Sequence, residues 1–271
     1  MSLLTFYGDE SGTNEGTRVA TVAGYLGQVS EWRRFEREWS KVLKKYQVRL
    51  MHRSDLETWH GEFTAECGWD PARRTAFLTE LQPIIKSCTK VAVGSAIIKE
   101  DFQEVMPEWL RRFFGGVYGW CAHECIVAVR VWCERPNRGR AHPINWAFEQ
   151  GAEGQGQVAA MFTELSQIPG LKAAFRIGEF SFPDKTVVPL QAADLLAYEI
   201  IKQVENQILD RGEKHDVRLS VQHLMRPQDP TYLKYWDKAR LREWLSKSEE
   251  RGALDEIRRR WSSDKPTDAE S

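Results

Sequence analysis

The sequence predicts an α/β fold in which an antiparallel hairpin is followed by alternating helices and strands. Short apolar runs of strand length alternate with longer segments whose apolar residues recur at helical spacing. The first two runs are joined by a short cluster of turn formers, which favours antiparallel pairing. Eleven tryptophans and 11% aromatic residues indicate a well-packed interior. We therefore expect a sheet flanked by helices.

The first third of the chain is predicted to contain two strands and two long helices. Residues 3–8 form a buried strand that ends at Asp9, and residues 18–26 form the second strand. Ser30 is the predicted N-cap of an amphipathic helix over 31–46. Asp70 and Pro71 start another helix, which runs to about residue 88.

Further strands and helices alternate along the rest of the chain. Strands are expected at 90–98, 144–149 and 171–180. Helices are expected at 111–134, from a glycine-rich loop at 151–156 to residue 167, at 189–208, and at 232–246 and 249–261. Residues 262–271 are polar, and we expect a disordered tail there.

The composition gives no general attraction to polyanions or membranes. The formal net charge is −1, so nucleic acid could be bound only by a local basic patch. No stretch approaches the roughly 18 consecutive apolar residues of a membrane span. The first residues lack the features of a signal peptide, and the five cysteines include no Cys-x-x-Cys pair. We expect reduced thiols in a cytoplasmic protein.

An acidic residue lies at the edge of the apolar stripe of the predicted helix over 189–208. At about 100° per residue, Asp194 falls beside Gln191 and Tyr198. A partly desolvated carboxylate must be compensated by a basic partner or a metal ion. The alternative is a structural Asp that accepts hydrogen bonds from nearby backbone.

The helix over 117–132 shows the same anomaly more clearly. Glu124 lies near the middle of the face defined by Val117, Trp120 and Val131. A Glu on the core face of a helix requires a ligand or a partner. A buried Glu–Arg pair is the structural alternative.

Asp9 and Glu149 stand at the ends of predicted strands that open into glycine-rich loops. Strand ends that face a cleft are where α/β enzymes place catalytic groups. Glu10 points to the other side of its strand, because side chains alternate along a strand. Only Asp9 of this pair should therefore face the site.

Four gathered acids repel one another and stay ionised only around a cation. Oxygen ligands favour Mg²⁺ or Mn²⁺ over zinc, and one or two such ions suit phosphodiester hydrolysis. The sequence therefore predicts that Asp9, Glu124, Glu149 and Asp194 are both metal ligands and catalytic residues of a metal-dependent hydrolase.

Two motifs resemble those of the domain-of-unknown-function 3800 family, which is grouped with ribonuclease H-like proteins. They are Tyr-Gly-Asp-Glu-Ser-Gly at 7–12 and Gln-Ala-Ala-Asp-Leu-Leu-Ala-Tyr at 191–198, and the similar arrangement covers roughly residues 3–208. The resemblance implies antiparallel first strands, then parallel ones, and a nuclease-like activity without a defined substrate. It also implies acids from the first strand, the first core helix, the fourth strand and a late helix. The four acids named above occupy those positions in that order.

The resemblance implies a ribonuclease H-like domain at 1–208, a helical C-terminal extension at 209–261 and the tail at 262–271. Two departures from the pattern are a helical insertion at 27–88 and Glu149, where ribonuclease H enzymes typically have Asp. His52 and Asp55 lie in the insertion. They are either a proton donor with its orienting carboxylate, or part of a polar loop with a helix cap.

Binding of a nucleic acid, DNA or RNA, requires cations near the acids. The predicted phosphate contacts are residues of the basic face of helix 31–46 and two residues before the Glu124 helix. They are Arg33, Arg34, Arg37, Lys41, Arg111 and Arg112. The alternative interpretation of the basic face is a solvent-exposed helix surface without a ligand. Accessory candidates beside the acids are Glu10, Ser11, His52, Asp55 and Gln191.

Two other functions fit parts of the sequence. Residues 9–13 resemble the nucleophile loop of haloacid dehalogenase-like phosphatases, which form an aspartyl phosphate. Such loops carry a second Asp where this chain has Ser11. The other alternative is a binding or assembly protein without catalysis, with the charged helices after residue 230 as its partner surface. The sequence does not choose between DNA, RNA and a small phosphoester as substrate.

Overall fold

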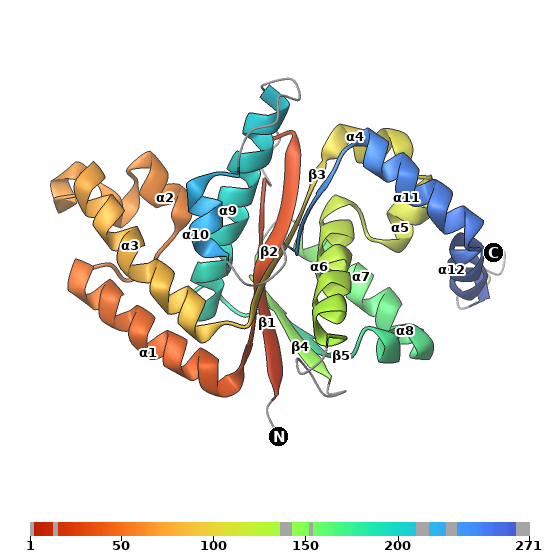
Figure 1. Cartoon of the computed structure of the whole chain (residues 1–271), viewed down its shortest axis with the longest axis horizontal. Helices are drawn as coiled ribbons and strands as arrows, with labels where there is room; N and C mark the ends of the chain where they lie inside the picture. Colours follow the sequence, from red (N-terminus) through yellow and green to blue (C-terminus); the bar gives the residue numbers. More distant parts are fainter. Residues whose placement is uncertain are drawn as a thin grey trace, which may run out of the picture.

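A six-stranded mixed sheet separates two layers of helices (Figure 1). The computed structural model describes residues 3–12, 16–135, 143–151, 154–209, 217–225 and 232–263. The strands are β1 (Leu4–Ser11), β2 (Val19–Gln28), β3 (Val91–Ile98), β4 (Ile144–Phe148), β5 (Ile177–Ser181) and β6 (Tyr232–Trp236). Their order is β5-β4-β1-β2-β3-β6; β2 is antiparallel to β1 and β3, and the other pairs are parallel. The expected antiparallel start followed by parallel strands is confirmed.

One layer of helices covers the face of the sheet that we call the α9 face. α9 (Val188–Leu209) packs directly on β1, β2 and β3. Outside it lie α1 (Val29–Tyr46), α2 (Arg53–Thr58), α3 (Pro71–Cys88) and α10 (Leu219–Leu224), with two short 3-10 turns at Gly61–Phe63 and Ala65–Cys67. The segment between β2 and β3 is therefore helical, as predicted. Its buried aromatic side chains, such as Trp39 and Phe77, join α9 in one hydrophobic core.

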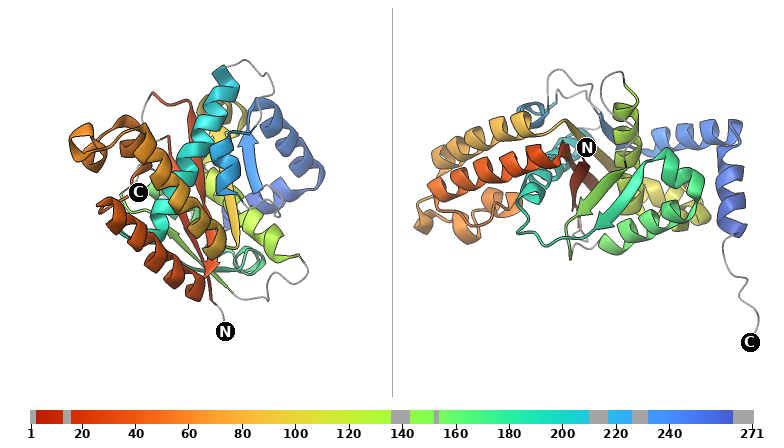
Figure 2. Two further views of the ribbon diagram at one scale, coloured as in Figure 1. Left: turned by 60° about the vertical axis from the view of Figure 1, so that its left-hand side comes forward. Right: turned by 90° about the horizontal axis from the view of Figure 1, so that it is seen from below.

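The other layer covers what we call the α6 face. It contains α6 (Val117–Cys133), α7 (Gln155–Gln167) and α8 (Pro169–Ala174). α4 (Lys99–Val105), α5 (Glu108–Phe113), α11 (Lys238–Glu250) and α12 (Ala253–Ser263) lie toward the outer end of this layer (Figure 2). Trp120, Trp132 and Trp146 fill its separate hydrophobic core and are almost completely buried.

β1 supplies side chains to both cores, because alternate residues of a strand point to opposite faces. Leu4 and Phe6 belong to the core under α6, whereas Tyr7 packs against the core under α9. Asp9, two residues after Tyr7, therefore lies on the α9 face.

The structure corrects two predicted helices. The helix expected over 111–134 is broken between α5 and α6, because Gly115 and Gly116 take positive φ angles of 71° and 105°. Residues 232–236 form β6 and not the start of a helix, because they pair with β3 while Tyr232 and Trp236 pack on the core under α6. The C-terminal extension is thus not purely helical. The short helices α4 and α8 were not predicted.

Residues 264–271 of the expected disordered tail lie outside the described residues, and the two before them end α12. Among the residues that the structure describes, no helix is long and apolar enough to cross a membrane.

Candidate carboxylate site

Asp9 is a buried carboxylate near the C-terminal end of β1. Only 6% of its surface is exposed, and its Oδ1 accepts a hydrogen bond of 2.8 Å from the backbone N–H of Glu10. β1 is internal to the sheet, between β2 and β4, so the strand holds the carboxylate in a fixed place. A charge at this position needs compensation, because burial removes it from water.

Glu149 and Asp194 reach the same region from β4 and α9. β4 is parallel to β1 and pairs Phe148 with Gly8, so Glu149 follows β4 at the level of Asp9. Asp194 lies in the second turn of α9, which packs on β1. Both carboxylates are partly buried.

The three acids influence one another electrostatically. Burial, and then the charges of Asp194 and Glu149, raise the pKa of Asp9 well above its ordinary value. Burial and the charge of Asp194 raise the pKa of Glu149. Burial also raises the pKa of Asp194, although the charge of His52 and the backbone N–H of Arg53 act in the opposite direction. The structure thus brings these three predicted residues together.

No Lys, Arg or His within the described ranges forms an ion pair with any of the three carboxylates. In the same part of the chain, no three His, Cys, Asp or Glu side chains are already arranged as ligands of one metal ion. Within the described residues, the cluster is therefore a concentration of negative charge without a direct ion-pair partner, and not a preformed coordination shell.

Glu124 is not part of this cluster, contrary to the prediction. It lies on α6, on the other face of the sheet, and is 3% exposed. Its Oε2 accepts a hydrogen bond of 2.6 Å from Nζ of Lys234 on β6, and Nδ1 of His123 is 3.3 Å from its Oε1. Although burial acts to raise the pKa of Glu124, these two partners lower it overall. The ion pair expected as the structural alternative is present, with Lys in place of Arg.

His52 and Asp55 lie beside the acids. Nδ1 of His52 is 2.9 Å from Oδ2 of Asp55, three residues later in α2. The charge of His52 acts to lower the pKa of both Asp194 and Glu149, and the N–H of the next residue, Arg53, donates to Oδ2 of Asp194 at 2.7 Å. His52 is also the N-cap residue of α2, without a capping hydrogen bond from its side chain. Both interpretations of these residues stay predictions.

The other three accessory candidates are Gln191, Glu10 and Ser11. The Oε1 of Gln191 accepts hydrogen bonds from Nε1 of Trp39 at 3.0 Å and the N–H of Met51 at 3.2 Å, so this side chain is buried in packing. Glu10 points to the α6 face, as expected, and accepts a hydrogen bond of 2.5 Å from the N–H of Gly154. Ser11 ends β1 opposite Thr21.

The predicted phosphate-binding arginines are not gathered at the acids. Arg111 and Arg112 lie on α5, in the α6 layer, and interact with Gln103 and Glu108. They are therefore on the opposite face of the sheet from the three acids, in the same layer as the Glu124 helix.

The arginines of α1 lie in the helix layer on the α9 face, as the acids do, but some of them already interact with other residues. Arg34 donates hydrogen bonds to Sγ of Cys88 and to the carbonyl oxygen of Ser87, at the C-terminal end of α3. Arg37 and Lys41 both pair with Glu38 on the helix surface. Arg33 is exposed.

Two exposed lysines were not among the predicted phosphate contacts, although one of them, Lys44, belongs to the basic face of helix 31–46. Lys185, in the loop before α9, acts to lower the pKa of Glu149. Lys44 lines an open groove of about 760 Å³ together with Asp55, Thr186 and Gln191. Both lysines are exposed, and neither makes an ion pair with a residue that the structure describes. The sequence signal that could have indicated Lys185 as a phosphate contact is the group of turn formers around it, just before the helix that carries Asp194.

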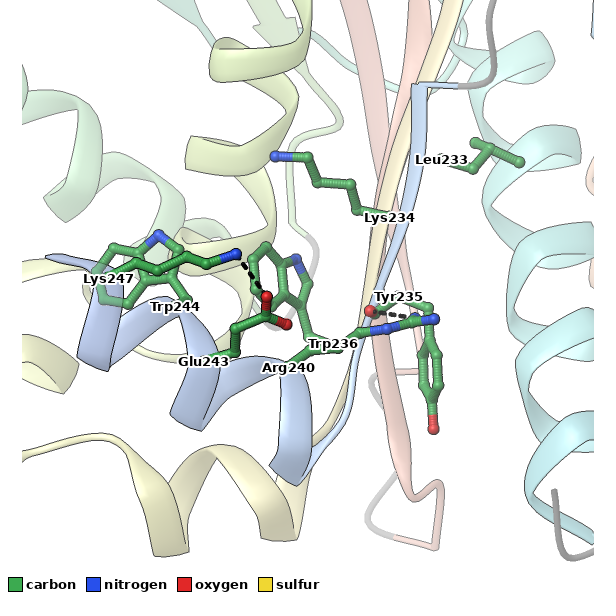
Figure 3. A pocket seen from close by; sticks show the side chains of 8 residues that line it. All are labelled: Leu233, Lys234, Tyr235, Trp236, Arg240, Glu243, Trp244 and Lys247. Carbon is green, nitrogen blue, oxygen red and sulfur yellow. Dashed lines mark hydrogen bonds and ion pairs between the residues drawn. The ribbon is translucent and has the colours of Figure 1, made fainter.

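Two further hollows lie in the molecule. One, of about 640 Å³, runs beside β4 and β5 and is lined by Tyr7 and Ala147, each two residues before an acid of the cluster. The other, of about 430 Å³, lies between β6 and α11 at the opposite edge of the sheet (Figure 3). There Arg240 donates to the carbonyl oxygen of Tyr235 and Lys247 pairs with Glu243, so these cations are already engaged.

No model of a known protein family matches this chain, and no curated protein or solved structure matches it either. The function must therefore be argued from the site itself.

Proposed function

We propose that this protein is a metal-dependent phosphodiester hydrolase of the ribonuclease H-like type, in which Asp9, Glu149 and Asp194 hold Mg²⁺ or Mn²⁺. The observation that carries the proposal is the cluster of three carboxylates from β1, β4 and α9. Burial raises the pKa of each, the charge of Asp194 further raises those of Asp9 and Glu149, and none has an ion-pair partner in the described residues. Like charges in one site remain ionised when a cation joins them.

The topology supports the same proposal. Three antiparallel strands open the sheet and alternating helices and strands follow, with acids on the first strand, after the fourth strand and on a late helix. This is the arrangement that the resemblance to ribonuclease H-like proteins implies. The acid expected from the first core helix is missing from the cluster, so the proposal rests on three carboxylates.

The donor set fits a hard divalent ion. All three groups offer carboxylate oxygens, which Mg²⁺ and Mn²⁺ prefer. None of the three forms an ion pair with a described residue. Holding one ion requires the carboxylates to approach one another more closely, which a change of side-chain rotamers supplies. When bound, such an ion supplies Lewis-acid activation of water and of the phosphate.

The protein's own residues then have two tasks, to hold the ion and to position the phosphodiester. Lys185 acts electrostatically on Glu149, and Lys44 lines the groove that Asp55 also lines; we assign the phosphate contacts to these two exposed cations. Arg33 and Arg37, farther along α1, are proposed as outer contacts. Such contacts do not read sequence, so DNA and RNA are both candidate substrates.

The two alternatives are less well supported. In a haloacid dehalogenase-like phosphatase the first strand feeds a helix, whereas β1 here leads into the antiparallel strand β2. A binding protein without catalysis does not need a cluster of acids that lacks ion-pair partners. Titration with Mn²⁺ distinguishes such a binding protein from the proposed hydrolase.

The direct test is cleavage of labelled single- and double-stranded DNA and RNA with Mg²⁺ or Mn²⁺. Wild type should cleave at least one of them, and Asp9→Asn should not. Asn can still accept the hydrogen bond from the N–H of Glu10, so this variant should fold normally. Cleavage that survives the Asp9→Asn substitution would reject the site, and failure of wild type to bind Mn²⁺ in a calorimetric titration would reject the metal.

A further inference from the structure

The segment that leads into α2 is held against α9 by backbone hydrogen bonds. The N–H of Met51 donates to Oε1 of Gln191 at 3.2 Å, and the N–H of Arg53 donates to Oδ2 of Asp194 at 2.7 Å. The residue between them is His52. Both of its neighbours are therefore fixed to the helix that carries one acid of the cluster.

A buried ion pair adds a third attachment. Nε and Nη2 of Arg53 donate to Oε1 of Glu199 at 3.0 and 2.7 Å, and Nη1 donates to Glu57 at 2.7 Å. The Arg53 guanidinium also lies over the ring of Tyr198, 4.6 Å from its centroid. Arg53 is 5% and Glu199 2% exposed. Such pairs add little net stability because both charges lose water. The Arg53–Glu199 pair is therefore better explained by the position in which it holds the segment around His52.

The side chain of His52 is not buried with its neighbours. It is 45% exposed, and its Nδ1 is 2.9 Å from Oδ2 of Asp55. A carboxylate at Nδ1 sets the orientation and tautomer of an imidazole. Nε2 has no hydrogen-bond partner among the described residues, so it is free to meet a substrate. His52 directly precedes Arg53, whose N–H lies 2.7 Å from Oδ2 of Asp194, so the chain holds His52 close to this acid.

We propose that His52 is a catalytic general acid of this site and that Asp55 is the residue that positions it; this inference rests on the proposed hydrolase function. As the oxygen of water bonds to phosphorus and the water loses a proton to solvent, the bond from phosphorus to the sugar oxygen breaks, and its electron pair leaves with that oxygen. In its imidazolium form, with Nδ1–H directed at Asp55, His52 passes the proton on Nε2 to the leaving oxygen, giving an alcohol. The exposed imidazole then regains a proton from solvent.

The test compares substrates whose leaving groups differ in their need for a proton. A sugar alkoxide needs one, whereas 4-nitrophenolate, released from bis(4-nitrophenyl) phosphate, departs as a stable anion. With Mn²⁺ present, His52→Gln should lower cleavage of nucleic acid by about 10²-fold or more. It should change cleavage of the nitrophenyl ester only a few-fold. Asp55→Asn should show the same selectivity, with a loss of about tenfold.

His60→Gln is the matched control. His60 lies in the same segment and is exposed, with its Nδ1 2.8 Å from the carbonyl oxygen of Thr58. This variant should retain wild-type rates on both substrates. Calorimetric titration with Mn²⁺ should give the same affinity for wild type, His52→Gln and His60→Gln.

Each other outcome is decisive. Equal losses on both substrates with weakened Mn²⁺ binding would make His52 a metal ligand and overturn its role as an acid. Unchanged cleavage of nucleic acid by His52→Gln would overturn this inference alone. A wild-type protein that binds Mn²⁺ but cleaves neither substrate would reject the hydrolase function, and this role with it.

Discussion

Asp194 and Glu124 are both acids on helices that pack against the sheet, but their surroundings give them opposite chemistry. Burial raises the pKa of Asp194, near two other acids. Glu124 is more deeply buried, but its ion pairs with His123 and Lys234 outweigh burial and lower its pKa. One carboxylate is poised to receive a cation, and the other already has one.

Asp194→Asn should therefore leave the protein in EDTA as stable as wild type, or more so. The substitution removes like-charge repulsion, and the Asn oxygen can still accept the hydrogen bond from the N–H of Arg53. It should also abolish the stabilisation by Mn²⁺, which is about 2.7 kcal/mol for wild type at a hundred times the Kd. Chemical unfolding with and without Mn²⁺ measures both effects. A large loss of stability in EDTA would instead mark Asp194 as structural.

The raised pKa of Asp9 also predicts a pH dependence. Because burial and the neighbouring acids raise this pKa above its value in the unfolded chain, the folded protein keeps the Asp9 proton to higher pH. The resulting stabilisation is complete below the ordinary pKa of Asp and is lost as pH rises through the raised value. Without metal, Asp9→Asn should thus gain stability relative to wild type as pH rises from about 4, the ordinary pKa of Asp, through the raised pKa of Asp9. Urea unfolding at several pH values tests this, and a difference that does not vary with pH would contradict it.

At the scale of elements, β6 does more than extend the sheet. It pairs with β3 and carries the lysine that neutralises Glu124 on α6, so one strand of the C-terminal extension satisfies a buried charge of the central helix. The extension is for this reason part of the same folding unit as the sheet.

Lys234→Met should destabilise the protein by about 1–3 kcal/mol, because it leaves Glu124 buried with only His123 beside it. Adding Glu124→Gln should restore much of the loss, since the uncompensated charge is then gone. A double-mutant cycle of unfolding free energies measures the coupling. Glu124→Gln should leave the Mn²⁺ affinity unchanged; a weaker affinity would return Glu124 to the metal site.

At the scale of the whole molecule, the net charge of −1 gives no long-range attraction for nucleic acid. Binding must come from local cations, and the described structure offers Lys185, whose charge acts on Glu149, and Lys44, in the groove that Asp55 lines. Lys185→Glu and Lys44→Glu should each weaken binding to all sequences alike. Each lost contact should also reduce the slope of log K against log salt by about 0.7–0.9. Fluorescence anisotropy with the Asp9→Asn protein measures this without cleavage.

Lys247→Glu provides the matched control for these lysines. Lys247 lies on α11, at the opposite edge of the sheet, and is paired with Glu243 (Figure 3). Its reversal should leave both affinity and salt slope unchanged. Equal effects from all three reversals would indicate nonspecific attraction to the surface in place of a site at the acids.

Local patterns were sufficient to predict three of the four acids. Asp9 and Glu149 follow apolar strands and Asp194 interrupts a helical stripe, and each signal lies within about ten residues of sequence. Glu124 gave an equally clear signal of a buried charge. Its partner, however, is 110 positions away, and no local pattern indicates which ligand satisfies a buried carboxylate. The same limit applies to β6, whose five residues become a strand because β3 offers them an edge.

The cationic part of the site was predicted poorly for a related reason. Helix 31–46 has a continuous basic face. The distance of its basic side chains from the acids depends on how α1 packs against α9, and no local sequence pattern indicates that packing. Lys185, in the loop before α9, and His52, before α2, come from isolated positions that have no periodic context. Lys44 does lie on the basic face of α1, in its last turn.

The position of β6 has a consequence for how the protein is made. β3 is buried along its whole length and largely apolar, and its outer edge pairs with β6, about 130 residues later in the chain. At the ribosome's rate of about 5–20 residues per second, that edge stays open for roughly 7–27 s. During this interval the nascent chain carries a long apolar strand with unpaired backbone groups, a template for self-association. The finished sheet instead ends in a strand of five residues that bears a lysine, with one backbone carbonyl bound by Arg240. Synthesis at high yield should therefore depend on chaperones that bind the chain before residue 232 emerges.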